Sequence, residues 1–136
     1  MAKISSVIGK ELYKVEIKSP SGNMLIADEP IEKGGKDKGF SPKELLASAL
    51  ATCTSATVRM FADRKGWPLD EVYTEIELEQ NEKNNKTIIT RKIKFTGSLD
   101  EKQKGQLLTV ANACPIHKIL SHPIEIESYY NSTILI

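Results

Sequence analysis

The stretch from Phe40 to Arg64 constrains the fold of this chain more than any other. At its start, Ser41 can cap free backbone N–H groups, Pro42 fits the first helical position, and Glu44 can close a capping box. The run Lys65-Gly66-Trp67-Pro68 then supplies a cation for the negative helix end, a glycine stop and a proline. The pattern predicts a helix of about six turns that begins at Pro42 and ends near the end of the stretch.

The middle of this predicted helix, from Ala47 to Thr57, is almost entirely alanine, serine and threonine and carries no charge. A helix of this kind is buried on most sides, and its small side chains let another helix approach closely. On a helical wheel, Cys53 lies at the centre of the apolar face formed by Leu46, Ala49, Thr57 and Met60. We therefore expect a long, buried central helix that carries Cys53.

Length and charge narrow the class of protein. The 136 residues suit one domain, residues 1–136, and 19 Lys and Arg against 18 Asp and Glu argue against nucleic-acid binding. The N-terminus lacks a signal peptide pattern, and the uncharged run from Leu45 to Val58 is too short to span a membrane. We expect a cytoplasmic protein, in which two cysteines indicate redox chemistry, metal binding or packing rather than a structural disulfide.

Two strand pairs flank the helix in the sequence. Alternation over 12–18, a turn at 19–23 and an apolar run at 24–27 predict an N-terminal hairpin, which a glycine-rich, flexible connection over 32–39 follows. A second hairpin is predicted over 72–96. Glutamates of its first strand can pair across it with Arg91, Lys92 and Lys94, so they form a solvated face rather than a metal site.

A second helix is predicted after the second hairpin. Ser98-Leu99-Asp100-Glu101 reads as its capping box, and Leu107, Val110, Ala111 and Cys114 form its apolar stripe. A short helix over 115–120 follows, and strands over 124–130 and 133–136 complete the sheet. The order of strands and helices along the chain predicts an α+β fold with a largely antiparallel sheet. Because so few elements cannot cover the long helix, we also expect a second subunit to cover part of it.

Cys53 and Cys114 each lie on the apolar stripe of a predicted helix, so their thiols can meet on the same sheet. Taken singly, a cysteine on an apolar helical face is most often a small hydrophobic residue. A zinc site formed by both cysteines with His117 and His122 is a further alternative. His117 is otherwise expected as a helix-end residue near Cys114.

The motifs at 41–54 (Ser-Pro-Lys-Glu-Leu-Leu-Ala-Ser-Ala-Leu-Ala-Thr-Cys-Thr), 99–101 (Leu-Asp-Glu) and 113–118 (Ala-Cys-Pro-Ile-His-Lys) resemble those of the OsmC/Ohr family of thiol-dependent hydroperoxide reductases. The resemblance implies an intertwined homodimer without metal or flavin. It also implies that Cys53 is the peroxidatic cysteine and Cys114 the resolving one. A dithiol or lipoyl-type reductant would then regenerate the pair.

The best known members of the family that this sequence resembles have a carboxylate directly after the helix-opening proline and an arginine in the N-terminal strands. This sequence departs from both features. Here Lys43 follows the proline, Glu44 stands one place later, and no arginine precedes Arg59. Glu44 and Lys18 are therefore candidate supporting residues. A depressed pKa of Cys53 is a hypothesis without a named cation.

The leading functional prediction is a peroxidase that protects against oxidative stress, with a small or organic peroxide as substrate. The alternative is a non-enzymatic dimer of the same fold that binds a small apolar ligand between its helices. This alternative predicts that Cys53 reacts slowly with iodoacetamide at neutral pH.

Overall fold

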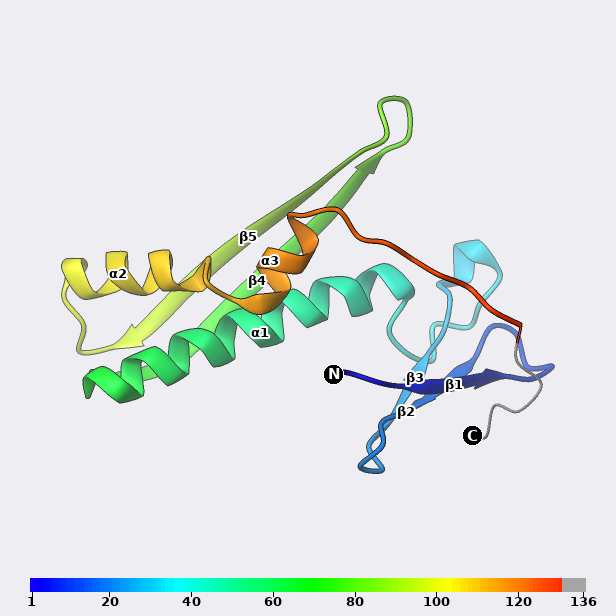
Figure 1. Ribbon diagram of the computed structural model, residues 1–136, viewed down its shortest axis with the longest axis horizontal. Coiled ribbons are helices and arrows are strands. Elements are labelled where there is room, and N and C mark those ends of the chain that lie inside the picture. The colour runs from blue at the N-terminus through cyan, green and yellow to red at the C-terminus, as the bar shows by residue number, and fades with distance from the viewer. Residues whose placement is uncertain (131–136) are drawn as a thin grey trace. The chain divides into compact units, whose positions relative to one another are not determined.

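The structure is a computed structural model that describes residues 1–130 (Figure 1). Its elements are β1 (Ser5–Ile8), β2 (Val15–Lys18), β3 (Met24–Ala27), the short 3₁₀ helix η1 (Ile31–Lys33), α1 (Pro42–Lys65), β4 (Leu69–Asn81), β5 (Lys86–Gly97), α2 (Glu101–Ala111) and α3 (Pro115–Leu120). Two compact units divide the chain, one formed by 1–45 with the C-terminal residues from 127 and one formed by 46–126. The predicted α+β class with antiparallel sheets is confirmed.

In the N-terminal unit, β1, β2 and β3 form an antiparallel sheet in that order. The glycine-rich connection after β3 is not the flexible segment that its composition predicts. The Asp28 carboxylate is 2% exposed and accepts hydrogen bonds from the backbone N–H groups of Tyr13, Glu29, Lys36 and Lys38. Burial alone would raise the pKa of Asp28, but these donors hold the pKa below its ordinary value. One carboxylate therefore organises this loop.

Helix α1 begins and ends as its sequence predicts. The Ser41 N–H donates to Glu44 Oε1 at 2.9 Å, and the Glu44 N–H donates to Ser41 Oγ at 3.2 Å, which completes the capping box. At the other end, Gly66 adopts a φ of 68°, and the Trp67 N–H reaches back to the Ala62 carbonyl at 2.9 Å. Glycine stops the helix because it adopts this left-handed conformation at little cost.

The buried side of α1 differs from the predicted one. One line of residues is buried, Leu50, Thr54, Val58 and Ala62, whereas Leu46 and Met60 are exposed and Cys53 is half-buried. The wheel could not identify this line because small residues occur all round the helix. Packing against other elements of the same chain selects the line, and the expectation that a second subunit covers the rest of the helix stays a prediction.

By length and composition alone, α1 could cross a membrane, since an 18-residue window has a mean hydropathy of 1.3. A central helix of a soluble protein meets the same criterion. The cytoplasmic location stays a prediction.

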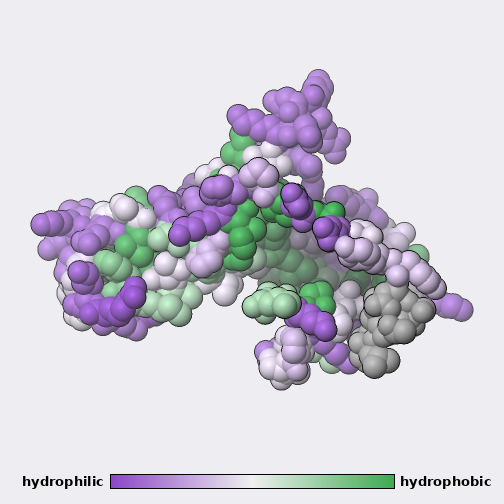
Figure 2. All heavy atoms as spheres, viewed as in Figure 1, coloured by the Kyte–Doolittle hydropathy of each residue, from purple (hydrophilic) through white to green (hydrophobic). Residues whose placement is uncertain are grey.

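The β4–β5 hairpin is antiparallel, with Glu75 opposite Lys92 and Ile76 opposite Arg91. The Glu75–Lys92 pair is present on the exposed face, with Nζ and Oε1 3.9 Å apart. The prediction that Arg91 joins this charged face is wrong, because alternation along the strand places Arg91 in phase with Ile89 and Ile93 on the half-buried face. At the far end of the hairpin the turn is hydrophilic (Figure 2).

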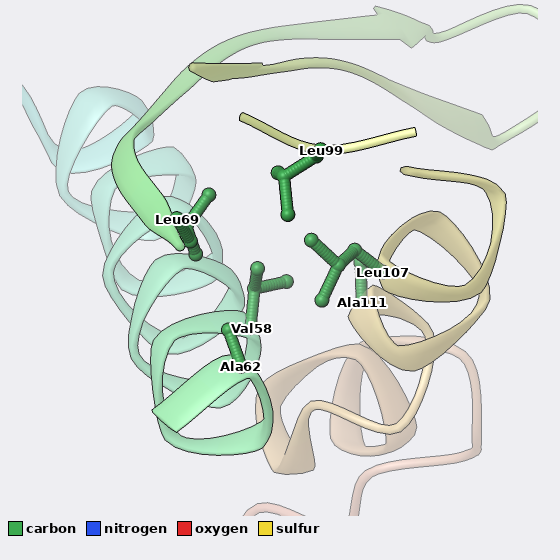
Figure 3. Packing of buried hydrophobic residues seen from close by; sticks show 6 residues of the cluster. All are labelled: Val58, Ala62, Leu69, Leu99, Leu107 and Ala111. Carbon is green, nitrogen blue, oxygen red and sulfur yellow. The ribbon is translucent and has the colours of Figure 1, made fainter. Parts of the chain in front are cut away.

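A buried cluster joins α1, the hairpin and α2. Figure 3 shows Leu69, Leu99 and Leu107 pointing toward Val58 and Ala62, and the cluster also includes Ala111. The capping box of α2 joins Asp100 and Gln103 rather than Ser98 and Glu101, because the helix begins later than predicted.

The predicted C-terminal strands are not confirmed. Residues 124–130 form no strand, and the strand predicted over 133–136 lies outside the described residues. The short helix predicted over 115–120 is confirmed as α3.

Replacing Leu107 with alanine is expected to lower the free energy of unfolding by about 2–5 kcal/mol, because a fully buried leucine leaves a cavity in this cluster. Leu108 is its matched control, since it lies on the same helix and is 54% exposed. Urea denaturation of both variants measures the difference. Equal losses of stability in the two variants would contradict the observed packing.

Candidate thiol site

The structure brings the two cysteines together. Cys53 lies in the middle of α1, and Cys114 lies in the turn between α2 and α3, where it is the N-cap residue of α3. Both are free thiols, and the Cys53 thiol is in hydrogen-bond contact with the Cys114 sulfur. Cys114 does not continue the stripe of α2, which ends at Ala111, but it is fully buried. The predicted approach of the two thiols is present, although the second helix ends earlier than expected.

The Cys114 sulfur is surrounded by hydrogen-bond donors. The His117 backbone N–H donates to the sulfur over 3.4 Å, and the Cys53 thiol, the Ile116 N–H and the Thr54 hydroxyl also act to lower its pKa. Burial would raise the pKa of Cys114, but these donors outweigh burial and hold the pKa below that of an ordinary thiol. Cys114 is therefore the sulfur that is stabilised as a thiolate.

Cys53 has the opposite tendency. Burial raises the pKa of Cys53, and so does the hydrogen bond that its thiol donates to Cys114. The Ile116 N–H and the Thr57 hydroxyl lower the pKa, but they do not offset these effects. The hypothesis of a depressed pKa at Cys53 is thus wrong, because the donors gather around the other sulfur.

Two thiols in contact lose their protons in two steps that belong to the pair. Within the pair, the pKa of Cys114 is lowered and the pKa of Cys53 is raised, and the contact between the two thiols contributes to both shifts. Within the described chain, Cys53 is half-buried, whereas Cys114 is fully buried.

Arg91 of β5 is an arginine that contacts the residues around the two cysteines. Its Nη1 donates to Thr54 Oγ1 at 2.9 Å and to the Ala111 carbonyl at 3.4 Å. Its Nη2 donates to Asn112 Oδ1 at 2.7 Å and lies 3.4 Å from His117 Nδ1. The sequence contained a signal for this residue, because Arg91 interrupts the apolar phase of its strand. An arginine in that phase faces the inside of the hairpin.

A pocket of about 240 Å³ adjoins Arg91 and His117. Its other lining residues are Leu50, Thr87, Ile89, Leu120 and Ser121. Three aliphatic side chains and two nitrogen-bearing groups suit a small amphipathic molecule.

Glu44 and Lys18 are not brought to the thiols by any contact that the structure describes. Glu44 is occupied by the capping box, where hydrogen bonds from Ser41 lower the pKa of its carboxyl. Lys18 is the last residue of β2 in the N-terminal unit. Over residues 1–130 no three side chains with metal-ligating atoms converge, so the zinc alternative is not supported.

Comparisons with solved structures find proteins with the same fold. A protein from Psychrobacter arcticus 273-4, assigned to an osmotic stress induced and detoxification response, is 25% identical, with a TM-score of 0.77 and 90% of each chain covered. An OsmC like protein from Mycoplasma pneumoniae is 20% identical, with a TM-score of 0.75, 89% of this chain and 87% of that chain covered. The organic hydroperoxide resistance protein OhrB of Bacillus subtilis is 22% identical, with a TM-score of 0.61, 88% of this chain and 89% of that chain covered.

The chain therefore has the α+β fold of the OsmC and organic hydroperoxide resistance proteins. It belongs to the OsmC-like protein family, whose sequence signature matches residues 35–128. A comparison with curated proteins found no match. The predicted family resemblance is confirmed.

Mild oxidation is expected to join Cys53 and Cys114 within one chain, because the two sulfurs are already in contact. Non-reducing peptide mapping by mass spectrometry would detect the linked peptides. The single variants Cys53→Ser and Cys114→Ser are the controls and cannot form the link. Recovery of only intermolecular disulfides from the wild-type protein would contradict the observed geometry.

Proposed function

We propose that this protein is a thiol-dependent hydroperoxide reductase that uses Cys53 as the peroxidatic cysteine and Cys114 as the resolving cysteine in defence against oxidative stress. The observation that carries the proposal is the contact between two free thiols of unequal exposure and unequal acidity. Membership of the OsmC-like family and the fold shared with organic hydroperoxide resistance proteins support it.

The unequal thiols suit a division of roles. Cys53 is the half-buried sulfur that a peroxide can reach, and Cys114 is the buried sulfur that holds negative charge. As Cys53 attacks, its proton can pass along the existing hydrogen bond to Cys114, which acts as the base. A sulfur with a higher pKa is also the stronger nucleophile once it has lost its proton.

The reaction balances in three steps. The Cys53 sulfur attacks the terminal peroxide oxygen, the O–O bond breaks, an alcohol leaves with one proton, and Cys53 becomes a sulfenic acid. The Cys114 sulfur then attacks the sulfenic sulfur, which forms the disulfide and releases water. A dithiol or lipoyl-type reductant restores both thiols and becomes a disulfide itself. These steps need no metal or flavin.

The pocket beside Arg91 and His117 suits the organic part of the peroxide. Leu50, Ile89 and Leu120 offer apolar contact to an alkyl or aryl group. Small hydroperoxides that fit the pocket are therefore the proposed substrates.

The wild-type protein is expected to consume cumene hydroperoxide with a dithiol, and Cys53→Ser is expected to abolish this activity. Cys114→Ser is expected to stop at the sulfenic acid and slow turnover by about 100-fold or more, because it removes both the base and the resolving thiol. The rate should rise with pH through the first thiol ionisation, since the lowered pKa of Cys114 supplies the base in its active form only above that pKa. A peroxide assay over a pH series measures these outcomes.

Equal peroxide consumption by wild-type protein and Cys53→Ser would contradict the proposal. One observation favours the alternative of a non-enzymatic dimer that binds an apolar ligand, since the raised pKa of Cys53 agrees with a slow thiol. A fluorescent apolar probe that binds the pocket of an inactive wild-type protein would support that alternative.

The proposed assembly is an intertwined homodimer. In one chain, Leu46 and Met60 of α1 are exposed, at 43% and 63%, although they belong to an uncharged, small-sided helix face. A second copy of the chain would cover this face, in agreement with the family resemblance. The proposed location is the cytoplasm, with no nucleic acid or membrane as partner.

Light scattering is expected to give twice the mass of the 15.1 kDa chain. Met60→Glu should shift the protein toward the monomer, because it places a charge on the face that a second copy would cover. Arg64→Glu is the control, since Arg64 is exposed near the end of α1 and its position already carries a charge. A wild-type protein of monomer mass would contradict the proposed assembly.

A further inference from the structure

Arg91 occupies an unusual position for a charged residue. It lies on the half-buried face of β5 between Ile89 and Ile93, opposite Ile76 of β4. Among the described residues no carboxylate lies within ion-pair distance of its guanidinium. Its contacts are instead neutral groups that surround the two thiols. An unpaired cation on an inner face is costly, so its retention there calls for a role.

The first contact of Arg91 controls a buried hydroxyl. Thr54 is fully buried on α1, and a helical threonine commonly donates its hydroxyl to a carbonyl one turn earlier. Here Arg91 Nη1 donates to Thr54 Oγ1 at 2.9 Å. Arginine can only donate, so it occupies a lone pair of the oxygen and leaves the threonine proton free to point elsewhere. That proton is then available to the Cys114 sulfur, whose pKa the Thr54 hydroxyl lowers.

The remaining contacts fix the turn that carries Cys114. Arg91 holds the Ala111 carbonyl at 3.4 Å and Asn112 Oδ1 at 2.7 Å, just before the cysteine. It also lies 3.4 Å from His117 Nδ1, just after the cysteine. Because arginine donates, Nδ1 accepts, and the ring proton of a neutral His117 then lies on Nε2. The planar guanidinium thus contacts residues on both sides of Cys114 in this turn.

We infer that Arg91 is the positioning residue of the dithiol: its guanidinium turns the Thr54 hydroxyl toward Cys114 and fixes the turn on which Cys114 lies. This inference rests on the proposed function, because it explains how the buried sulfur becomes the base of that reaction. It also supplies a cation from β5, a strand that the family resemblance did not indicate. Arg91 acts through Thr54 and the turn and does not touch the reacting sulfur of Cys53.

The surroundings of the pair leave few other sources for this effect. Arg91 of β5 and His117 of α3 are the charged or titratable side chains, apart from the cysteines, that the described hydrogen bonds place around Thr54 and the Cys114 turn. The glutamates of β4 lie on the exposed face of the hairpin. The α1 residues that contact the sulfurs, Thr54 and Thr57, are neutral.

The test measures thiolate formation in the full-length protein without peroxide, by ultraviolet absorbance over a pH series. Arg91→Met is expected to raise the pH of the first ionisation by about one unit, which corresponds to a tenfold loss of thiolate below that pH. Arg91→Lys should recover little of this shift, because lysine keeps the charge but lacks the fork. Lys92→Met is the matched control, since Lys92 is the next residue of the same strand and lies on the exposed face.

Thr54 provides a second test that leaves Arg91 in place. Thr54→Val keeps the shape but removes the hydroxyl, so it should raise the pH of first ionisation, whereas Thr54→Ser should restore it. Adding Arg91→Met to Thr54→Val should then produce a smaller further shift than Arg91→Met alone, because the two residues act in one chain of contacts. Circular dichroism checks that each variant is folded. If Arg91→Met does not fold, the Thr54 variants decide the outcome.

Unchanged ionisation in folded Arg91→Met, or in Thr54→Val, would overturn the inference. An equal shift in Lys92→Met would overturn it as well, since any nearby positive charge would then suffice. The proposed function fails on a different result, namely a wild-type protein that consumes no peroxide. That result does not depend on how the thiols of the variants ionise.

Discussion

The packing of one line of α1 against the hairpin and α2 is the contact on which the candidate site depends. Val58 and Ala62 meet Leu107 and Ala111 in a buried cluster, and this fixes the rotation of α1 about its axis. With that rotation, Thr54 faces inward and Cys53 lies beside it, half-exposed. Because α2 is held in the same cluster, the turn that follows it delivers its cysteine to the same place.

Around that contact the two sulfurs have different chemical environments. Donors from three directions converge on Cys114: a helix hydroxyl, two backbone N–H groups and the neighbouring thiol. Cys53 has fewer hydrogen-bond donors around its sulfur, and its own thiol donates to Cys114. The asymmetry arises from burial, backbone N–H groups and threonine hydroxyls, and none of its causes is a carboxylate. This differs from the arrangement that the family resemblance led us to expect, in which a carboxylate and an N-terminal arginine hold the thiolate.

Much of the fold could be predicted from local signals. The start and end of α1, the two hairpins and α3 follow from capping residues, glycine and proline positions and alternation, all of which act over a few residues. The approach of the two thiols was also predicted, although Cys114 lies beyond the end of α2 and Cys53 lies beside the buried line of α1 rather than on it. The buried line of α1 was not predictable, because its small residues give a helical wheel no contrast. The loop around Asp28 was missed for a similar reason, since a single buried carboxylate leaves no periodic trace.

The sequence by itself determined the limits of α1 and α3, which family the chain belongs to, and that two cysteines carry the chemical interest. The tertiary structure alone decided which thiol has the lowered pKa and that Arg91 contacts the residues around the pair. Alternation along β5 already placed Arg91 in phase with the apolar residues of the strand, but only the folded structure shows that its side chain contacts Thr54 of α1. The physical reason is that a pKa depends on donors and burial in three dimensions, and these come from segments far apart in the chain.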